Sequence, residues 1–161
     1  MSAIVVLDST PLGLVTNPKG GADAEDCTAW LNELIDAQVR IVVPEIVDYE
    51  LRREFLRTKK TNALRRLDEF NKDVATYLPI TTPAMLKAAE FWATLRQDGK
   101  PGAADTALDA DVILAAQAFG LTEDGQKVVI ATENVKYLQH RADARHWRAI
   151  TLESLQQDAS E

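Results

Sequence analysis

Short runs of consecutive hydrophobic residues alternate along the chain with longer stretches in which hydrophobic residues recur every three or four positions. The three clearest runs, at 3–7, 40–43 and 127–131, are rich in valine and isoleucine. Continuous β-branched runs of this kind predict strands that are buried on both faces, as in a parallel sheet. We expect two further short strands, at 78–80 and 147–151.

The stretches between these runs have the spacing of amphipathic helices. Helices are expected at about 24–37, 45–58, 61–77, 83–96, 108–118, 135–140 and 152–157. The spacing in the fourth of these predicts a buried face made of Met85 or Leu86, Ala89, Trp92 and Ala93. The segment from Gln97 to Ala104 contains glycine and proline and is expected to be a loop.

Strands that alternate with helices predict an α/β domain. We expect a three-layer α/β/α sandwich, with helices flanking a central, mostly parallel sheet of four to five strands. The length of 161 residues fits a single domain spanning 1–161. The only cysteine, Cys27, excludes an internal disulfide and fits a reducing, cytoplasmic location. No hydrophobic run approaches the roughly 20 residues of a membrane span, and we expect no membrane association.

The formal net charge of −7 argues against general electrostatic binding to nucleic acid. The charge is unevenly distributed, however. The block from Arg52 to Arg66 carries seven basic residues and one acidic residue. Such a block is commonly a solvated helical face, but it would also suit a strip that follows phosphates or a docking surface for an acidic partner.

Four acidic residues occupy positions where chemistry would be expected. Asp8 directly follows the first strand, and ligands bind at the carboxyl ends of strands in open α/β sheets. Asp109 and Asp111 lead into the alanine-rich helix, and Glu50 borders the apolar face of the second helix. Each also has a simpler interpretation: an Asx turn for Asp8, a helix cap for one of the aspartates and an ion pair with Arg53 for Glu50.

Converging carboxylates repel one another unless a cation lies between them, and Mg²⁺ and Mn²⁺ prefer oxygen ligands. Other kinds of site are not indicated. His140 and His146 lack the spacing of a zinc site, and no G-x-S-x-G nucleophile motif occurs. The phosphate-binding glycine motifs of Walker and Rossmann type are absent from the sequence as well.

Four segments in order carry a resemblance to a known family. They are IVVLDST (4–10), VPEIVDYELRRE (43–54), LDADVILAAQA (108–118) and VVIATENVKYL (128–138). Together they resemble the PIN domain, the nuclease fold of many toxins in type II toxin–antitoxin modules. The resemblance covers almost the whole chain and implies a metal-dependent endoribonuclease. It assigns the acidic positions to Asp8, Glu50 and Asp111, and the fourth site position to Asn134, where many relatives carry aspartate.

The resemblance also suggests roles for individual residues. Asp8, Glu50 and Asp111 would bind Mg²⁺ or Mn²⁺, with Asp109 as an alternate or outer ligand. Asn134 or Thr132 would position the attacking water. The basic residues expected to bind the RNA backbone are Arg52, Arg53, Arg57, Lys59 and Lys60.

Partners and an alternative function follow from the same resemblance. We expect RNA as substrate and an antitoxin protein as partner. The apolar surface of the helices at 24–37 and 45–58 makes a homodimer a reasonable expectation. The alternative is a non-catalytic PIN-like module that binds nucleic acid or protein. Such a module would show no activity with any divalent cation.

Overall fold

The structure is a computed structural model in which residues 3–99 and 105–157 are described. Its centre is a sheet of five parallel strands in the order β3-β2-β1-β4-β5. The strands are β1 (Ala3–Leu7), β2 (Arg40–Pro44), β3 (Thr76–Leu78), β4 (Lys127–Thr132) and β5 (Ala144–His146). β1 lies in the middle and all of its residues are buried, which explains why its hydrophobic run shows no alternation.

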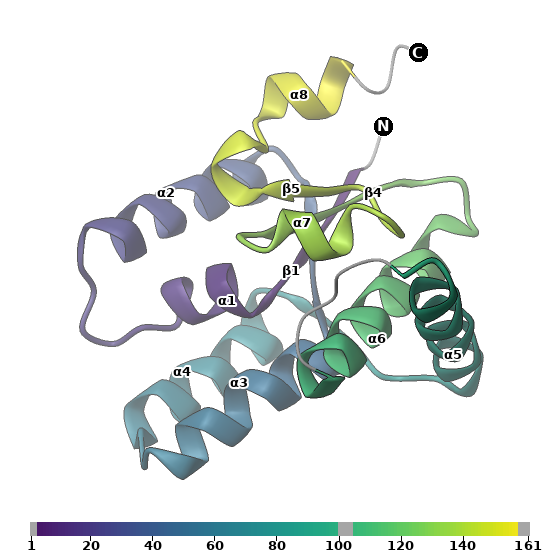
Figure 1. Cartoon of the computed structure of the whole chain (residues 1–161). Helices are drawn as coiled ribbons and strands as arrows, with labels where there is room; N and C mark the ends of the chain where they lie inside the picture. The colour runs from purple at the N-terminus through teal and green to yellow at the C-terminus, as the bar shows by residue number, and fades with distance from the viewer. Residues whose placement is uncertain (1–2, 100–104, 158–161) are drawn as a thin grey trace.

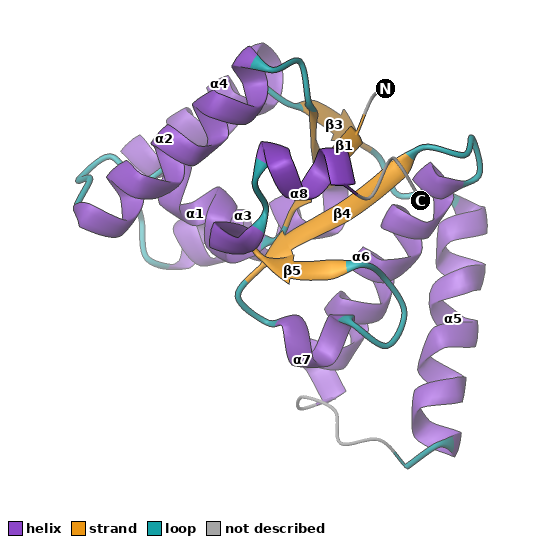
Figure 2. Ribbon diagram, turned by 90° about the horizontal axis from the view of Figure 1, so that it is seen from above, coloured by secondary structure: helices purple, strands orange, loops and turns teal. Residues whose placement is uncertain are grey.

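Helices flank the sheet (Figure 1 and Figure 2). They are α1 (Ser9–Val15), α2 (Ala22–Asp36), α3 (Glu45–Arg57), α4 (Thr61–Asp73), α5 (Thr82–Gln97), α6 (Asp105–Thr122), α7 (Val135–Leu138) and α8 (Leu152–Gln157), with a 3₁₀ turn at Trp147–Ala149. Right-handed crossovers place α1–α4 on one face of the sheet and α5–α7 on the other. α2 and α3 contact β2, α6 contacts both β2 and β4, and α7 contacts β5. The expected three-layer α/β architecture is confirmed.

The strand order also fixes where a ligand would bind. From β1 the chain proceeds to β2 and β3 on one side of the sheet, and it then crosses over to β4 and β5 on the other side. β1 and β4 are therefore neighbours from which the connections lead in opposite directions. A crevice forms outside the carboxyl ends of two such strands, and open α/β sheets bind ligands there.

Two helices near the strand ends differ from the prediction. The strand expected at 3–7 is confirmed, but no helix was expected at α1, which begins at Ser9. Pro11 lies in the first turn of α1, where a missing N–H costs nothing because that turn has no acceptor for it. The helix expected at 61–77 stops at Asp73, and Thr76–Leu78 pairs with β2 instead.

The C-terminal edge strand was expected at 147–151 but lies at Ala144–His146. The hydrophobic residues that suggested it are buried without forming a strand. Trp147 and Ile150 enter the core from the 3₁₀ turn and its end, and the Trp30 indole N–H donates to the Ile150 carbonyl at 2.7 Å. Burial alone therefore did not distinguish a strand from a turn here.

The predicted buried face of α5 is also wrong. Met85, Leu86 and Trp92 are 44%, 65% and 40% exposed, whereas Ala88 and Leu95 are buried. α5 has hydrophobic residues around most of its circumference, so spacing could not select one face. Packing selects it, because Ala88 and Leu95 lie in a hydrophobic cluster completed by Leu108, Val112 and Ala116 of α6.

α6 extends beyond its predicted range at both ends. Since it begins at Asp105, both Asp109 and Asp111 lie within the helix, and neither is its N-cap. The expected loop from Gln97 to Ala104 falls largely outside the described residues. No helix within residues 3–99 and 105–157 combines the length and hydrophobicity needed to cross a bilayer.

Gln117 connects the elements that carry the site. Its side chain is 3% exposed, and its oxygen accepts from the Ile46 N–H at 3.2 Å while its nitrogen donates to the Leu78 carbonyl at 2.9 Å. The Ile46 N–H belongs to the first turn of α3 and has no acceptor within that helix. Gln117 therefore fixes the start of α3 against α6 and the end of β3.

We predict that Gln117→Ala lowers the free energy of unfolding by about 2–4 kcal/mol, because it leaves a buried N–H and a buried carbonyl without partners. Urea denaturation followed by circular dichroism would measure the loss. Gln139→Ala, at an exposed position after α7, is the control and should change stability little. Equal effects of the two substitutions would contradict the bridging role.

Candidate active site

The candidate site lies at the carboxyl ends of β1 and β4, where the direction of the connections changes. Asp8 follows β1 and caps α1, and Thr132 is the last residue of β4. Glu50 comes from the middle of α3, and Asp111 from the second turn of α6. Four segments that are far apart in sequence thus contribute to one region.

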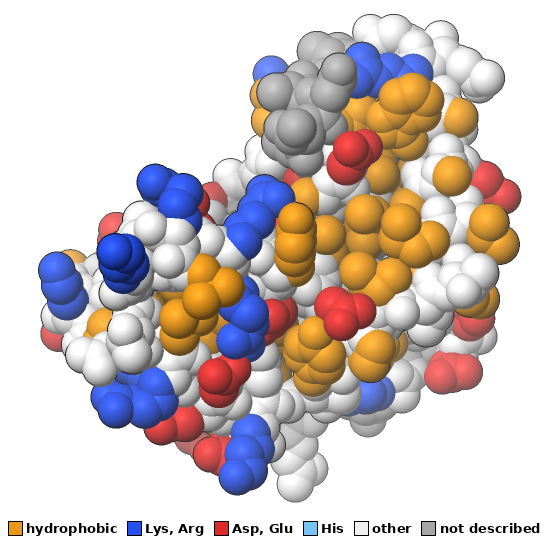
Figure 3. Space-filling view, turned by 90° about the horizontal axis from the view of Figure 1, so that it is seen from below, with side chains coloured by type: hydrophobic (Ala, Val, Ile, Leu, Met, Phe, Trp, Pro, Cys, Tyr) orange, Lys and Arg blue, Asp and Glu red, His pale blue; other side chains and the backbone are white. Residues whose placement is uncertain are grey.

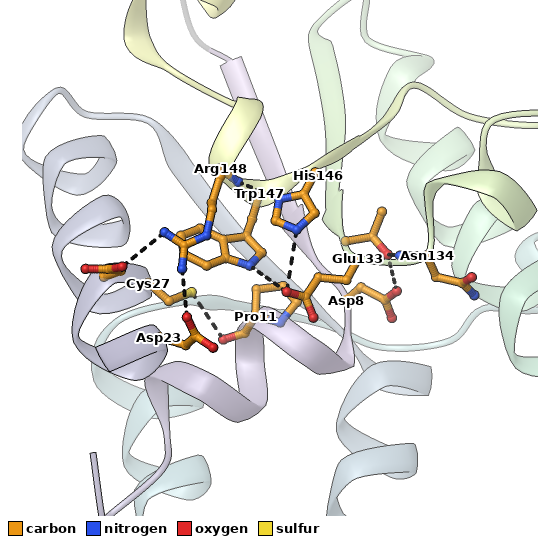
Figure 4. Close-up of polar contacts among 11 residues, drawn as sticks. Asp8, Pro11, Asp23, Cys27, Glu133, Asn134, His146, Trp147 and Arg148 are labelled. Atoms are coloured by element: carbon orange, nitrogen blue, oxygen red, sulfur yellow. Dashed lines mark hydrogen bonds and ion pairs between the residues drawn. The ribbon is translucent and has the colours of Figure 1, made fainter. Parts of the chain in front are cut away.

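Asp8 is the most tightly held of these residues. Its side chain accepts a hydrogen bond from the Ser9 N–H at 2.7 Å through Oδ1 and one from the Thr132 hydroxyl at 2.7 Å through Oδ2 (Figure 4). It is 7% exposed, and burial raises the pKa of its carboxyl although both hydrogen bonds act in the opposite direction. The two hydrogen bonds therefore do not fully offset the cost of burying the charged form of Asp8.

Three carboxylates lie near enough to one another for their charges to interact. Burial, followed by the charges of Asp8 and Glu50, raises the pKa of Asp111 from 3.8 to about 7. Burial and the charge of Asp8 likewise raise the pKa of Glu50, and the Arg53 guanidinium only partly opposes this. The sequence pointed to these three acids, and the fold places them within electrostatic reach of one another.

One oxygen at the centre of this group has no partner. Asp111 Oδ2 is buried and receives no hydrogen bond from any described residue. A buried carboxylate oxygen without a donor is costly, and a divalent cation would satisfy it. An all-oxygen donor set with excess negative charge is also the set that Mg²⁺ and Mn²⁺ prefer, so these residues fit such an ion.

The carboxylates are not, however, already gathered into a metal-binding cluster. Within residues 3–99 and 105–157, no three His, Cys, Asp or Glu side chains lie close enough together to hold an ion as they stand. The charges of Asp8 and Glu50 raise the pKa of Asp111, so bringing the three groups closer together without a cation would cost free energy.

Thr132 and Asn134 complete the region from the β4 side. Thr132 is fully buried, and its hydroxyl donates to Asp8 while it accepts from the Asn134 N–H at 2.8 Å. A hydroxyl has one proton, so the proton of Thr132 is committed to Asp8. Thr132 therefore orients Asp8 and the turn that carries Asn134, and its expected role in positioning a water stays a prediction. Asn134 occupies the N-cap position of α7 but makes no capping bond through its side chain.

Asp109 is not brought to this region. It lies about 200° around the helix from Asp111, since the two are two residues apart. It is exposed and lines a groove of about 370 Å³ between α5 and α6, beside Trp92 and Val112. We therefore leave Asp109 out of the proposed ligand set.

The predicted RNA-binding residues have different surroundings. Arg52 forms ion pairs with Asp48 at 2.9 Å and with Asp68 at 2.7 Å, which fixes α3 to α4. Arg57 pairs with Glu54, and Arg53 lies over the Tyr49 ring at 5.0 Å. Lys59 and Lys60 are exposed at the turn between α3 and α4.

A polar network beside the site was not identified from the sequence. Glu133 Oε1 lies 3.4 Å from the Trp147 indole nitrogen and 3.5 Å from His146 Nε2 (Figure 4). Arg148 covers the Trp147 ring at 4.3 Å and pairs with Asp23 and Asp26. Of these residues, only Glu133 lies in one of the four segments that resemble the PIN domain. Only the fold could therefore reveal the network.

Cys27 has the environment expected of a core residue. It is fully buried among hydrophobic residues, and its thiol lies 3.8 Å from the Pro11 carbonyl. Burial raises the pKa of the thiol to about 12, so the unreactive thiol form predominates at neutral pH.

Comparison with solved structures shows which proteins share the fold. A chain of the VapBC2 structure from Rickettsia felis bound to a promoter DNA fragment matches 89% of this chain and 98% of its own length, with 18% identity and a TM-score of 0.68. A chain of FitAcB from Neisseria gonorrhoeae matches 91% and 99%, with 19% identity and a TM-score of 0.66. A chain of VapBC-1 from nontypeable Haemophilus influenzae matches 90% and 98%, with 18% identity and a TM-score of 0.64. Comparison of the sequence with family models and with curated proteins gave no match.

The raised pKa of Asp111 predicts a pH-dependent stability. Between about pH 4 and pH 7 the folded protein holds a proton that the unfolded chain has lost, so the free energy of unfolding falls as the pH rises through this range. We predict that Asp111→Asn makes the metal-free protein more stable than the wild type at pH 8, by at most about 4 kcal/mol, and that the gain shrinks toward pH 5.

Thermal unfolding in EDTA at both pH values would measure the effect. Asp109→Asn is the matched control, because it makes the same change at an exposed position of the same helix. A gain that is the same for both substitutions, or independent of pH, would show that Asp111 is not held where its charge is disfavoured.

Proposed function

Given that the chain has the PIN-domain fold expected from its four motifs, we propose that it is a metal-dependent endoribonuclease that hydrolyses RNA phosphodiester bonds. The observation that supports this most directly is the convergence of Asp8, Glu50 and Asp111 at the point where the sheet connections reverse. A binding surface for RNA alone would gain nothing from three carboxylates, since they repel phosphate.

Each residue of the site would have a distinct role. Asp8, Glu50 and Asp111 hold Mg²⁺ or Mn²⁺, and the partnerless Oδ2 of Asp111 is the oxygen with most to gain. When bound, the ion supplies an activated water and stabilises the charge that develops on the phosphate. Thr132 holds Asp8 in a fixed orientation through its hydroxyl. Asn134 offers an amide oxygen that orients the water without adding negative charge.

The protein would act in a toxin–antitoxin pair, with an antitoxin protein as partner. The shared fold of VapBC and FitAcB chains supports this proposal. A homodimer stays a prediction. Ile35, Tyr49 and Leu56 on α2 and α3 are exposed hydrophobic residues that are compatible with it. RNA as the substrate places the activity in the cytoplasm.

Cleavage of a mixed tRNA and rRNA pool tests the catalytic proposal. We predict cleavage with Mg²⁺ or Mn²⁺, none in EDTA, and a loss of at least about a hundredfold in Asp8→Asn and Asp111→Asn, because each removes a ligand. Asp109→Asn should retain activity. Cleavage that persists in both site variants would refute this site.

Metal binding can be measured independently of cleavage. Mn²⁺ should raise the melting temperature of the wild type at pH 8, because an ion that binds only the folded state stabilises it. The same addition should have little effect on Asp111→Asn. A folded protein that neither binds the ion nor cleaves the pool would favour the alternative, a non-catalytic binding module.

The role of Thr132 predicts a difference between two substitutions. Thr132→Val keeps the volume but removes the donor to Asp8, so we expect kcat to fall roughly tenfold to a hundredfold with KM for RNA little changed. Thr132→Ser keeps the hydroxyl and should restore most of the rate. If the serine variant is as slow as the valine variant, the hydroxyl is not what matters at this position.

A further inference from the structure

A cleft of about 510 Å³ lies between the loop that follows α1 and the turn that joins α3 to α4. Lys19 lines it from the first segment, and Lys59 and Lys60 line it from the second. The chain has an excess of acidic residues, yet no Asp or Glu in the described part lines this cleft. The Lys and Arg side chains gathered over α3 and α4 in Figure 3 contrast with the hydrophobic side chains over α5 and α6.

The three lysines differ from those cations of this protein that are held in ion pairs. Arg52, Arg57 and Arg148 are engaged by carboxylates. Within residues 3–99 and 105–157, by contrast, no carboxylate forms an ion pair with Lys19, Lys59 or Lys60. Lys60 lies close enough to Glu54 to lower the pKa of that carboxyl, but the two form no ion pair. Lysines that face a cleft without such a pair are available to an anionic ligand.

Backbone groups add to the positive character of the cleft. Asn62 and Ala63, in the first turn of α4, also line it. Their N–H groups find no acceptor among the described residues, as is usual for a helix start without a side-chain cap. Lysines and free amides together are the donors that bind phosphate oxygens.

The cleft is connected to the carboxylates by two helices. α1 starts after Asp8 and ends shortly before Lys19, and α3 carries Glu50 and ends shortly before Lys59. Both start at the same edge of the sheet, because β1 and β2 are parallel, and they are in close contact near Gly13 and Leu51 (Figure 1). The seven residues of α1, and the eight from Glu50 to Arg57, each span about 10 Å.

We propose that this cleft binds the backbone of the RNA substrate about three nucleotides away from the scissile phosphate, which deepens the proposed function and rests on it. A stacked strand carries one phosphate per roughly 3.4 Å, so about 10 Å corresponds to about three nucleotides. The cleft and the carboxylates have complementary roles, because the lysines attract the backbone that the acidic site repels.

The test compares labelled single-stranded RNAs of about two and about ten nucleotides by fluorescence anisotropy, in the Asp111→Asn background so that no cleavage occurs. We predict that Lys19→Gln weakens binding of the longer RNA roughly fivefold and lowers the slope of log affinity against log salt by about 0.7. Binding of the short RNA should not change. Lys72→Gln, at the opposite end of α4 and exposed, is the matched control.

Lys59→Gly separates loss of the cation from loss of the fold. Lys59 has a φ of 56°, a left-handed conformation that glycine adopts more readily. The variant should melt no lower than the parent and yet bind the longer RNA more weakly. Equal effects of Lys19→Gln and Lys72→Gln, or equal effects on short and long RNA, would overturn the cleft as a backbone site. DNA of the same length binding as well as RNA would show that only phosphates are recognised.

The outcomes also separate this proposal from the catalytic one. Length-dependent binding that requires Lys19, in a protein without nuclease activity, would support the cleft and refute the nuclease. Metal-dependent cleavage without any dependence of binding on Lys19 would support the nuclease and refute the cleft as a backbone site.

Discussion

Repulsion among three partly buried carboxylates is the constraint on which the arrangement of this protein depends. Asp8, Glu50 and Asp111 come from a strand end, one helix and another helix. The charge of Asp8 raises the pKa of both others, and the charge of Glu50 raises the pKa of Asp111. Nothing in their own chemistry would bring them together. The sheet and its packed helices do so, at a cost in stability that is greatest when all three are ionised.

The elements that hold the carboxylates are themselves fixed by buried polar contacts. Thr132 binds Asp8 across the neighbouring ends of β1 and β4, and Gln117 joins the start of α3 to α6 and to the end of β3. Both side chains are buried, and both form hydrogen bonds with backbone or carboxylate groups that would otherwise lack a partner. The acidic residues thus lie on elements whose relative positions are set by neutral hydrogen bonds.

The sequence was sufficient for β1, β2 and β4, because a buried strand has a local pattern, but β3 and β5 lie elsewhere than expected. The candidate acids Asp8, Glu50 and Asp111 also came from the sequence, and their role stays a prediction. A continuous hydrophobic run identifies β1, and Asp8 follows it directly. It was insufficient where the outcome depends on packing partners. The buried face of α5 is set by its packing against Leu108, Val112 and Ala116 of α6, and the part played by Thr132 depends on a hydroxyl proton whose acceptor is 124 positions away. Lys19 lies outside the basic block, so only the fold could place it opposite Lys59.

The distribution of charge explains why the carboxylates and the lysine-lined cleft lie in separate places. A chain with a net charge of −7 binds nucleic acid poorly in general, and its carboxylate site is locally unfavourable to phosphate. Cations would therefore be expected where the strand enters but away from the carboxylates, since a lysine among them would compete with the proposed metal ion. α1 follows Asp8 and ends shortly before Lys19, and α3 carries Glu50 near its middle and ends shortly before Lys59, so both helices meet these requirements. Asn134 also limits the negative charge, because an amide in place of a fourth carboxylate supplies an oxygen without adding to the repulsion.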